Sequence, residues 1–395
     1  MLCSRIEPRF FPAVLESIGS DRTGEKIMRK KGEILLFLLR ELRPAELHIL
    51  KQELLSVGGD LATPRDALLC EKPSYNALLI ATRSQLERVI TKCKHQPFAL
   101  KSLSQTLQSH LESKALDSST LASSPPTPEI MPIINLTPDS FYAPSRHTSA
   151  RAIESIQELL TQGARLIDIG AASSRPGSPL INALDEIARL QEVCDFIKRE
   201  NLGAKACFSI DTYNAKTAAF ALESGFRIVN DVSALGDRAM LAVVRDFGAD
   251  FILMHTKGTP ETMASLANYK HLLSEIDTFF TRKLELLESS GVGEVILDIG
   301  FGFAKDSAQN LALIQHLRHF KHFGKRVLVG ASQKRTIGDL LNAPHPNDRL
   351  SGSLSLHLLA LQNGADIIRA HHYKEHSDML KVFLSFSSAC YVEHL

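Results

Sequence analysis

Eight short apolar runs in the second part of the chain each end in polar side chains. If the runs end side by side, these carboxylates, amides and basic groups could bind a polar ligand together. Asp and Asn also cap helices that follow strands, so capping is the alternative for any one of them. Four Asp, two Asn and two His in one set favour a shared site. The set is Asn135, Asp168, Asp211, Asn230 with Asp231, His255, Asp298, Ser332, and Arg369 with His371.

Basic residues near these ends suit an anionic ligand. Arg369, and Arg175 in "SSRPG" (173–177), could each fork onto phosphate oxygens. Lys334 could add a point charge, or it could be a surface lysine in the polar segment "SQKR". Asn135 could supply one oxygen to a Mg2+ ion carried by the phosphate, because Mg2+ prefers few protein oxygens together with phosphate and water.

Asp298 ends the apolar segment "EVILD". A carboxylate there is costly unless donors meet it, and a flat heterocycle with adjacent N–H and NH2 groups would supply two. His371, His372 and His376 offer a metal site as an alternative, although no carboxylate spacing accompanies them for a closed zinc site.

A repeating pattern spaces these polar ends. A helical stretch stops at glycine, one to three residues follow, and an apolar run begins, as in "TQGARLIDIG" and "QNGADIIRAHH". Eight βα units in about 260 residues predict a (β/α)8 TIM barrel, an α/β fold whose strands end at one mouth. A doubly wound sheet is the alternative, but it usually has a glycine-rich turn after its first strand, and "NLTPDSF" is not one. The predicted strands are 131–135, 165–169, 206–211, 227–231, 250–255, 294–298, 326–330 and 366–371.

The chain before the barrel region has a different texture. The Ser/Thr/Pro/Ala-rich segment "ALDSSTLASSPPTP" predicts a linker at 115–128, which separates an N-terminal domain (1–114) from the barrel (129–395). We predict a small α+β fold for the N-terminal domain. Its expected elements are helices at 33–42, 45–59 and 98–113, and a short strand running into a helix over 76–94.

The composition restricts the partners. Among 395 residues, 44% are hydrophobic and 23% charged, and the net charge is +1, which argues against a nucleic-acid or membrane surface as a main partner. No apolar run approaches the roughly 18–20 residues of a membrane span, and the N-terminus has no secretory h-region. The six cysteines form no C-x-x-C pair, so we expect reduced thiols and a cytoplasmic protein.

Residues 129–385 resemble the dihydropteroate synthase family. The segments that carry the resemblance are "NLTPDSF", "DIGAASSRPG", "SIDTYNA", "VNDVSA", "LMHTKGTPETM", "LDIGFGFAKD", "GASQK" and "IIRAHH". They occur in the family's order. The N-terminal domain lies outside the minimal enzyme and resembles an extension of some bacterial members.

The resemblance implies a (β/α)8 barrel that joins 6-hydroxymethyl-7,8-dihydropterin diphosphate to 4-aminobenzoate, releasing diphosphate and giving dihydropteroate for folate synthesis. It implies Mg2+ as cofactor, a homodimer, and inhibition by sulfonamides. In the implied roles, the pterin is held by Asp211, Asn230, Asp298 and Lys334, and Mg2+ with diphosphate by Asn135. The diphosphate is gripped by Ser174, Arg175, Arg369 and His371. The aminobenzoate pocket is formed by Phe141, Ser174, Arg175 and Pro176, near Ser332 and Lys334. The implied catalytic set is Asn135, Lys334, Arg369 and His371.

Some positions depart from the family pattern. Gln333 stands where the family has arginine, Ala172 where it has glutamate, and His372 where it has aspartate. The first change removes a cation near the aminobenzoate and diphosphate. Two alternatives share the pterin contacts: a methyltransferase that passes a methyl group from methyltetrahydrofolate to a corrinoid, and a pterin-binding protein without synthase activity.

Overall fold

The computed structural model describes residues 8–112, 127–136, 145–172, 180–258 and 262–388. The chain divides into two units: residues 1–125 form the first, with 322–324 and 387–395 assigned to it, and the remaining residues form the second. Within the described ranges, no helix has both the length and the apolar character that crossing a membrane requires.

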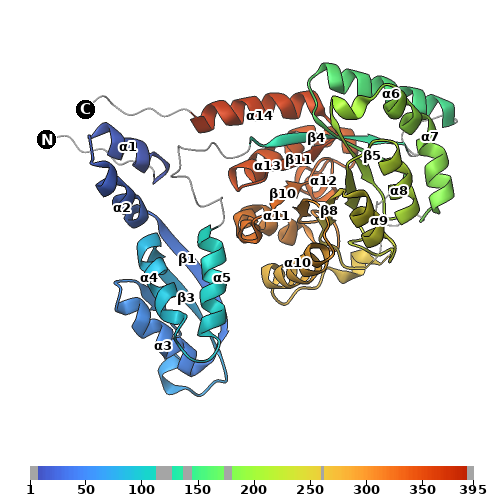
Figure 1. Cartoon of the computed structure of the whole chain (residues 1–395). Coiled ribbons are helices and arrows are strands. Elements are labelled where there is room, and N and C mark those ends of the chain that lie inside the picture. Colours follow the sequence, from blue (N-terminus) through green and yellow to red (C-terminus); the bar gives the residue numbers. More distant parts are fainter. Residues whose placement is uncertain (1–7, 113–126, 137–144, 173–179, 259–261, 389–395) are drawn as a thin grey trace. The chain divides into compact units, whose positions relative to one another are not determined.

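In the second unit, eight parallel strands of the described residues close into a barrel (Figure 1). The strand order is β10-β11-β4-β5-β6-β7-β8-β9, and β9 pairs with β10, so this sheet has no open edge. The predicted (β/α)8 barrel is therefore confirmed, and the doubly wound alternative is wrong. The strands are β4 (Glu129–Asn135), β5 (Leu166–Gly170), β6 (Cys207–Asp211), β7 (Ile228–Asp231), β8 (Asp250–Met254), β9 (Val295–Asp298), β10 (Arg326–Val329) and β11 (Ile367–Ala370).

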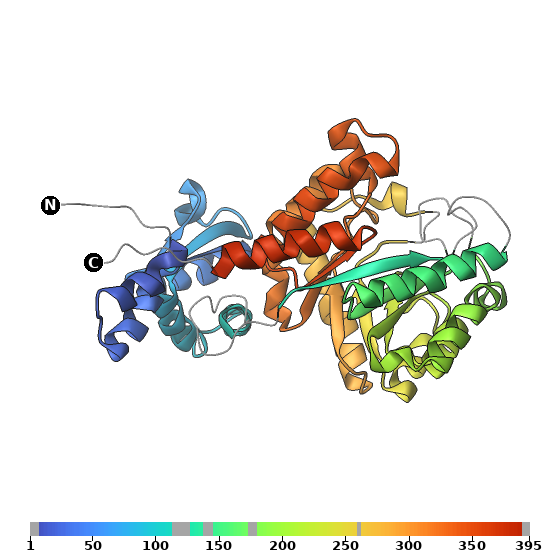
Figure 2. The same cartoon turned by 90° about the horizontal axis from the view of Figure 1, so that it is seen from above.

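Helices lie outside these strands, as both views of the second unit show (Figure 1, Figure 2). Gly364, just past a helix end, has φ +97°, a conformation that side chains with a Cβ rarely adopt, which explains the recurring glycine before a strand. The α-helices are α6 (Ser145–Thr161), α7 (Ala183–Arg199), α8 (Ala215–Glu223), α9 (Met240–Phe247), α10 (Leu272–Ser289), α11 (Ser307–Gln315), α12 (Arg335–Leu341), α13 (Leu350–Gln362) and α14 (Tyr373–Ser388). The 3-10 helices are η3 (Leu202–Ala204), η4 (Met263–Leu266), η5 (Leu317–Phe323) and η6 (Pro346–Arg349).

One face of the strands forms an apolar cluster. Its members are Met131, Leu166, Ile228, Ile252, Ile296, Leu328 and Ile367, with Cys207 packed against it. Because side chains alternate along a strand, residues two or four positions further on point the same way. Six polar side chains at the carboxyl ends of the strands therefore point to the same face as the apolar cluster. They are Asn135, Asp168, Asp211, Asn230, Asp298 and Arg369.

The first unit contains, among its described residues, a three-stranded antiparallel sheet in the order β1-β3-β2. Helices bury one side of it in a separate core that includes Leu50, Leu54, Leu79 and Leu86. The elements are η1 (Pro8–Phe10), α1 (Phe11–Ser17), α2 (Arg22–Gly32), β1 (Ile34–Leu42), α3 (Pro44–Leu55), β2 (Asp60–Ala62), η2 (Arg65–Leu69), β3 (Tyr75–Thr82), α4 (Arg83–Cys93) and α5 (Leu100–Glu112).

The predicted helix at 33–42 is wrong, because this segment is strand β1. Ile34 and Leu36 are 68% and 61% exposed whereas Leu35 and Leu39 are each 8% exposed, which is the alternation of a strand with one buried face. A continuous leucine-rich run satisfies both periods, and only the pairing with β3 decides between them. The predicted helices at 45–59 and 98–113 and the strand-then-helix at 76–94 are confirmed.

Candidate active site

Four side chains at the barrel mouth form one buried network, here called the acid–arginine cluster: Asp168, Asp211, Asn230 and Arg369. Arg369 Nε donates to Asp168 Oδ2 at 2.6 Å, and its Nη2 donates to Asp211 Oδ2 at 2.6 Å. Asn230 Nδ2 donates to the same Asp168 oxygen at 3.2 Å. One guanidinium therefore joins the ends of β5, β6 and β11, and Asn230 adds β7.

Burial dominates the electrostatics of this cluster. It raises the pKa of Asp211 to about 7, although the neighbouring guanidinium opposes that rise. Burial also works against charge on Arg369, but the pKa of Arg369 is raised, because Asp168 and Asp211 lie beside it. Asn230 Oδ1 and Asp168 Oδ1 are buried without a hydrogen-bond partner in the described part of the chain. Both atoms are acceptors, so a ligand that offers N–H donors would complement them.

Asp298 lies at the end of β9, 7% exposed. Its Oδ1 accepts the Gly300 N–H at 2.8 Å, so this carboxylate does cap the turn that follows, and burial raises its pKa. Gly300 has φ +64°, and a Cβ there would overlap the carbonyl oxygen of His255. His255 in turn donates its backbone N–H to the Asp298 carbonyl at 2.8 Å, which fixes the ends of β8 and β9 together.

Lys305 binds the backbone of this turn. Its Nζ donates to the carbonyl oxygens of Phe303 and Gly300, each at 3.0 Å, and to that of His255 at 3.3 Å. Burial lowers the pKa of this ammonium to about 7, while the Asp298 carboxylate opposes the shift. Three converging carbonyls favour the charged form, so the Lys305 ammonium holds the backbone after β9 in place through these three hydrogen bonds.

Lys334 projects over an aromatic ring. Its Nζ lies 4.2 Å from the centroid of Phe303, a cation–π contact, and it acts electrostatically on both Asp211 and Asp298. A half-buried lysine that acts on two buried carboxylates differs from the ordinary surface lysine of the alternative interpretation. Lys334 also precedes α12 as its N-cap residue.

Ser332 and His371 meet beside the cluster. The Ser332 hydroxyl lies 3.0 Å from His371 Nδ1 and accepts the His371 backbone N–H at 3.3 Å. Gln333, next in the chain, has φ +59°, and its Nε2 lies 3.0 Å from His372 Nε2. Side chains that follow β10 therefore contact side chains that follow β11, and these contacts join the two strand exits.

Asn135 ends β4 at the same mouth, half-buried and paired with Gly170 of β5. Among the described residues, no group of three His, Cys, Asp or Glu side chains at the mouth could enclose a metal ion. An oxygen donor without a protein cage fits Mg2+ that arrives on a phosphate. His376, one of the three histidines of the alternative metal site, is fully buried, with both ring nitrogens in hydrogen bonds to protein groups.

Four of the sequence-predicted residues lie outside the described ranges. They are Phe141, Ser174, Arg175 and Pro176. The other eight all lie at or just after the carboxyl ends of barrel strands. They are Asn135, Asp211, Asn230, Asp298, Ser332, Lys334, Arg369 and His371. Asp231, part of the polar set, instead caps its own turn by accepting from the backbone of Ser233 and Leu235, each at 2.7 Å.

Sequence reasoning missed a second layer of buried polar residues. Glu186 Oε2 accepts from Thr212 at 2.9 Å, from Asn214 at 2.8 Å and from Thr217 at 2.8 Å, which braces the segment after Asp211. Burial raises the pKa of Glu186. In the sequence it resembles an ordinary acidic residue in the first turn of a helix, so no signal distinguished it.

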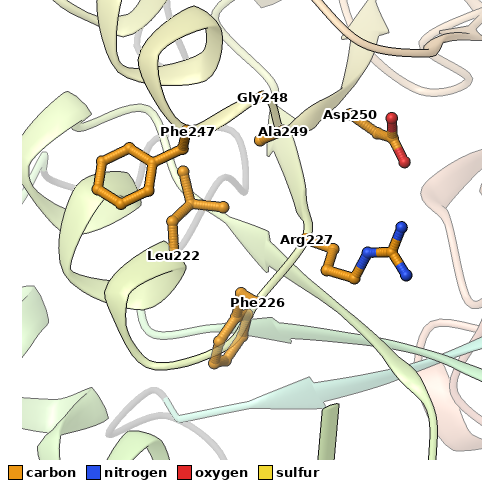
Figure 3. Close-up of a pocket in the computed structure, with 7 residues that line it drawn as sticks. All are labelled: Leu222, Phe226, Arg227, Phe247, Gly248, Ala249 and Asp250. Atoms are coloured by element: carbon orange, nitrogen blue, oxygen red, sulfur yellow. The ribbon is translucent and has the colours of Figure 1, made fainter. Parts of the chain in front are cut away.

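A hollow of about 150 Å³ lies at the opposite end of the barrel, where β7 and β8 begin. Figure 3 shows its apolar wall of Leu222, Phe226 and Phe247, with the charged ends of Arg227 and Asp250 on the other side. Small-molecule sites usually measure about 300–1,000 Å³, so this hollow is too small for a bicyclic ligand with a diphosphate.

Comparison with known proteins shows the family to which this chain is similar. Residues 131–371 match the family described as "Pterin binding enzyme". Over 98% of this chain and 99% of the relative, it is 49% identical to the bifunctional dihydropteroate synthase/dihydropteroate reductase of Helicobacter pylori. It is 34% identical to the dihydropteroate synthase of Escherichia coli over 66% of this chain and 93% of the relative.

A solved structure extends the similarity to three dimensions. The dihydropteroate synthase of Xanthomonas albilineans with 4-aminobenzoic acid matches 67% of this chain and 94% of its own, with a TM-score of 0.62 and 32% identity. The synthases therefore match about two thirds of the chain, whereas the bifunctional relative matches nearly all of it.

Proposed function

The chain belongs to the dihydropteroate synthases, and we propose that its pterin lies against Asp211, Asn230 and Asp298 at the barrel mouth. The enzyme is a transferase that joins 6-hydroxymethyl-7,8-dihydropterin diphosphate to 4-aminobenzoate. The observation that supports the pterin position is the convergence of buried acceptors there, two of which, Asn230 Oδ1 and Asp168 Oδ1, have no partner among the described residues. A pterin presents ring N–H and NH2 donors on one edge.

Arg369 can serve the pterin and the diphosphate at once. Its Nε and Nη2 are directed at Asp168 and Asp211, and its Nη1 has no hydrogen-bond partner among the described residues. We propose that Nη1, together with His371, receives the diphosphate. Asn135 would give an oxygen to Mg2+, which would neutralise charge on the departing diphosphate when bound.

The reaction needs orientation and charge stabilisation rather than a protein nucleophile. The amine of 4-aminobenzoate forms a bond to the pterin CH2 while the bond from that carbon to the diphosphate oxygen breaks. The electron-rich ring delocalises positive charge on the CH2. Lys334, held over Phe303, would steady the ring, and Ser332 would border the aminobenzoate.

Purified full-length protein, both substrates and Mg2+ test the function directly. We expect dihydropteroate and diphosphate in equal amounts, loss of turnover when a chelator removes the metal, and recovery with added Mg2+. The same assay with methyltetrahydrofolate and a corrinoid tests the methyltransferase alternative, which the comparisons do not favour. Pterin binding without product would instead support a protein that has lost its synthase activity.

We propose a second activity, reduction of dihydropteroate, for the full chain. Its support is the Helicobacter pylori relative, named for both activities, which matches 98% of this chain and therefore the first unit as well. Reduction of the dihydropterin ring consumes a two-electron donor, such as a reduced nicotinamide, and a proton.

Incubating the full chain with dihydropteroate and NADPH or NADH tests this second activity by loss of the nicotinamide absorbance and appearance of tetrahydropteroate. A chain that starts near Pro125 should keep synthase turnover and lose the reductase. Loss of synthase turnover in that shortened chain with intact circular dichroism would contradict the view that residues 1–114 stand apart from the synthase chemistry.

We also propose a cytoplasmic homodimer. The dimer follows the family expectation, and the location follows the composition and the free cysteines, of which Cys93 and Cys194 are buried thiols whose pKa burial raises. Light scattering across a concentration series tests the dimer, and fractionation of the source cells tests the location.

A further inference from the structure

Two buried histidines link the backbones at the exits of β10 and β11. His357 on α13 and His376 on α14 are both 0% exposed. Their Nδ1 and Nε2 atoms, respectively, lie 2.8 Å apart, and the ring centroids are 4.9 Å apart. None of the steps proposed for the reaction uses either residue. We call them the histidine pair.

The hydrogen bonds of the pair determine where its protons lie. The backbone N–H of Ala331 donates to His357 Nε2 at 3.0 Å, so that nitrogen carries a lone pair and the proton is on Nδ1. His357 Nδ1–H then donates to His376 Nε2. His376 Nδ1 carries the remaining proton and donates to the carbonyl of His372 at 2.6 Å. Only two neutral rings, each with its proton on Nδ1, satisfy all three bonds.

The ends of this chain of bonds lie beside residues of the proposed site. Ala331 precedes Ser332 and Gln333 after β10, and His372 follows His371 after β11. A second link between the same exits, from Ser332 to His371, lies on the ligand side. The pair therefore fixes the distance between the two exits on the side away from the proposed ligand.

The surroundings of the pair favour neutrality. Burial lowers the pKa of His357, and His376 and His371 act in the same direction. Burial lowers the pKa of His376 as well, where His372 adds to the effect and the carbonyl of His372 and Glu375 oppose it. A proton added to His357 Nε2 would face the Ala331 N–H, and one added to His376 Nε2 would face His357 Nδ1–H.

We propose that His357 and His376 are positioning residues, which act through the β10 and β11 exits to set Ser332 and His371 for 4-aminobenzoate and diphosphate. This rests on the proposed roles of Ser332 and His371. Of the proposed pterin contacts, Asp211, Asn230 and Asp298 lie on other strands, and Lys334 follows β10. Loss of the pair should therefore weaken the ligands held at the two exits more than it weakens free pterin.

The double variant His357→Leu/His376→Leu separates positioning from stability. Leucine at both positions removes the two rings and leaves the Ala331 N–H and the His372 carbonyl without these partners. The double variant should therefore lose stability, by about 1–3 kcal/mol for each buried group left unsatisfied. We expect kcat/KM for 4-aminobenzoate to fall by about 10- to 100-fold, the scale of a misplacement near 1 Å. Calorimetry should show a smaller loss of affinity for 6-hydroxymethyl-dihydropterin than for its diphosphate.

A matched control is Leu356→Ala, next to His357 on the same helix. It leaves a cavity and should cost about 2–5 kcal/mol of stability, with the pair intact. It should not alter the ratio of free-pterin to pterin-diphosphate affinity. A folded double variant with wild-type kinetics overturns the proposal, and so does an equal loss of affinity for both pterins.

Nitrogen NMR of labelled histidines tests the pair independently of turnover. Both rings should show the neutral Nδ1–H pattern in the wild-type protein at neutral pH. A neutral Nε2–H or a doubly protonated pattern at either ring overturns the proposal. Because these spectra need no substrate, failure of the pair and failure of the synthase assignment remain distinguishable.

Discussion

The two sides of the barrel mouth are held by opposite kinds of chemistry. The acid–arginine cluster fixes the ends of β5, β6 and β11 with charges, since one guanidinium bridges two buried carboxylates. The histidine pair fixes the exits of β10 and β11 without any charge, through three hydrogen bonds between neutral groups. The histidine pair joins neighbouring strands and lies behind the proposed ligand contacts, whereas the guanidinium reaches past β4 from β11 to β5 and β6 and belongs to those contacts.

This contrast predicts how each side fails. Removing one member of a buried ion pair leaves the other charge uncompensated, which is expensive. Removing both histidines leaves two neutral backbone groups without these partners but no buried charge, so it should cost less stability and still release the geometry of the two exits. The charged side should therefore lose stability and ligand binding together, whereas on the neutral side the two effects can be separated.

The largest effect is expected for Arg369→Ala. It leaves Asp168 and Asp211 as two buried like charges, so the free energy of unfolding in urea should fall by about 3–5 kcal/mol. The family resemblance assigns Arg369 to the diphosphate. Because Arg369 also fixes Asp211, free pterin should weaken too, with the diphosphate ester affected more. Adding Asp168→Asn should recover part of the stability, and no recovery would contradict the shared ion pair.

Asp298→Asn should act on binding with little change in folding. The asparagine oxygen can still accept the Gly300 N–H, but its NH2 would face a pterin donor. Losing a hydrogen bond to a charged group costs roughly 1.5–3 kcal/mol, which is about a 10- to 150-fold loss of pterin affinity. Calorimetry and a melting temperature on one sample decide the matter. A less stable variant that binds pterin normally would assign Asp298 to capping alone.

The histidine pair should make the free energy of unfolding depend on pH. A histidine whose pKa is lower folded than unfolded binds its proton more readily when unfolded, so stability falls as pH drops below about 6.5. The pKa values of His357 and His376 are both lowered by burial, so both histidines act in this direction. Unfolding free energies at about pH 7.5 and 5.5 should therefore differ more for wild type than for His357→Leu/His376→Leu. Equal differences would mean that the pair is not buried neutral.

The smallest effect concerns Gln333, which lies between the two sides with φ +59°. Gln333→Gly and Gln333→Ala both remove the contact with His372, but only glycine relieves the left-handed strain. The glycine variant should be the more stable by about 1 kcal/mol, measured by thermal unfolding. An alanine variant of equal or greater stability would show that the strain is absent.

Much of the mouth followed from local pattern. Glycine, an apolar run and a polar end recur along the chain, and strand parity then gives Asp211, Asn230 and Asp298 one orientation. The Asp168–Arg369 bond could not be predicted, because it joins residues 201 positions apart across the closed barrel. The histidine pair was equally hidden, since His357 and His376 lie in helical stretches with no chemical motif.

Local pattern also misled where two periods coincide. The leucine-rich run at 33–42 fits a helix by propensity, and only its partner β3 makes it a strand. Propensity is a local quantity, whereas register with a partner some forty residues away is not. Glu186 shows the same limit for polar residues, because its three partners come from a later strand exit and helix.

Gly300 also constrains how this enzyme can evolve. Every single-nucleotide change of a glycine codon that alters the residue introduces a Cβ or a stop, and a Cβ at this position would overlap the His255 carbonyl. Position 300 is therefore closed to any single-nucleotide substitution that leaves this turn undisturbed, unlike side chains such as Gln333. An inhibitor that contacts the backbone at Gly300 would meet a position that such a mutation cannot change without shifting the turn itself.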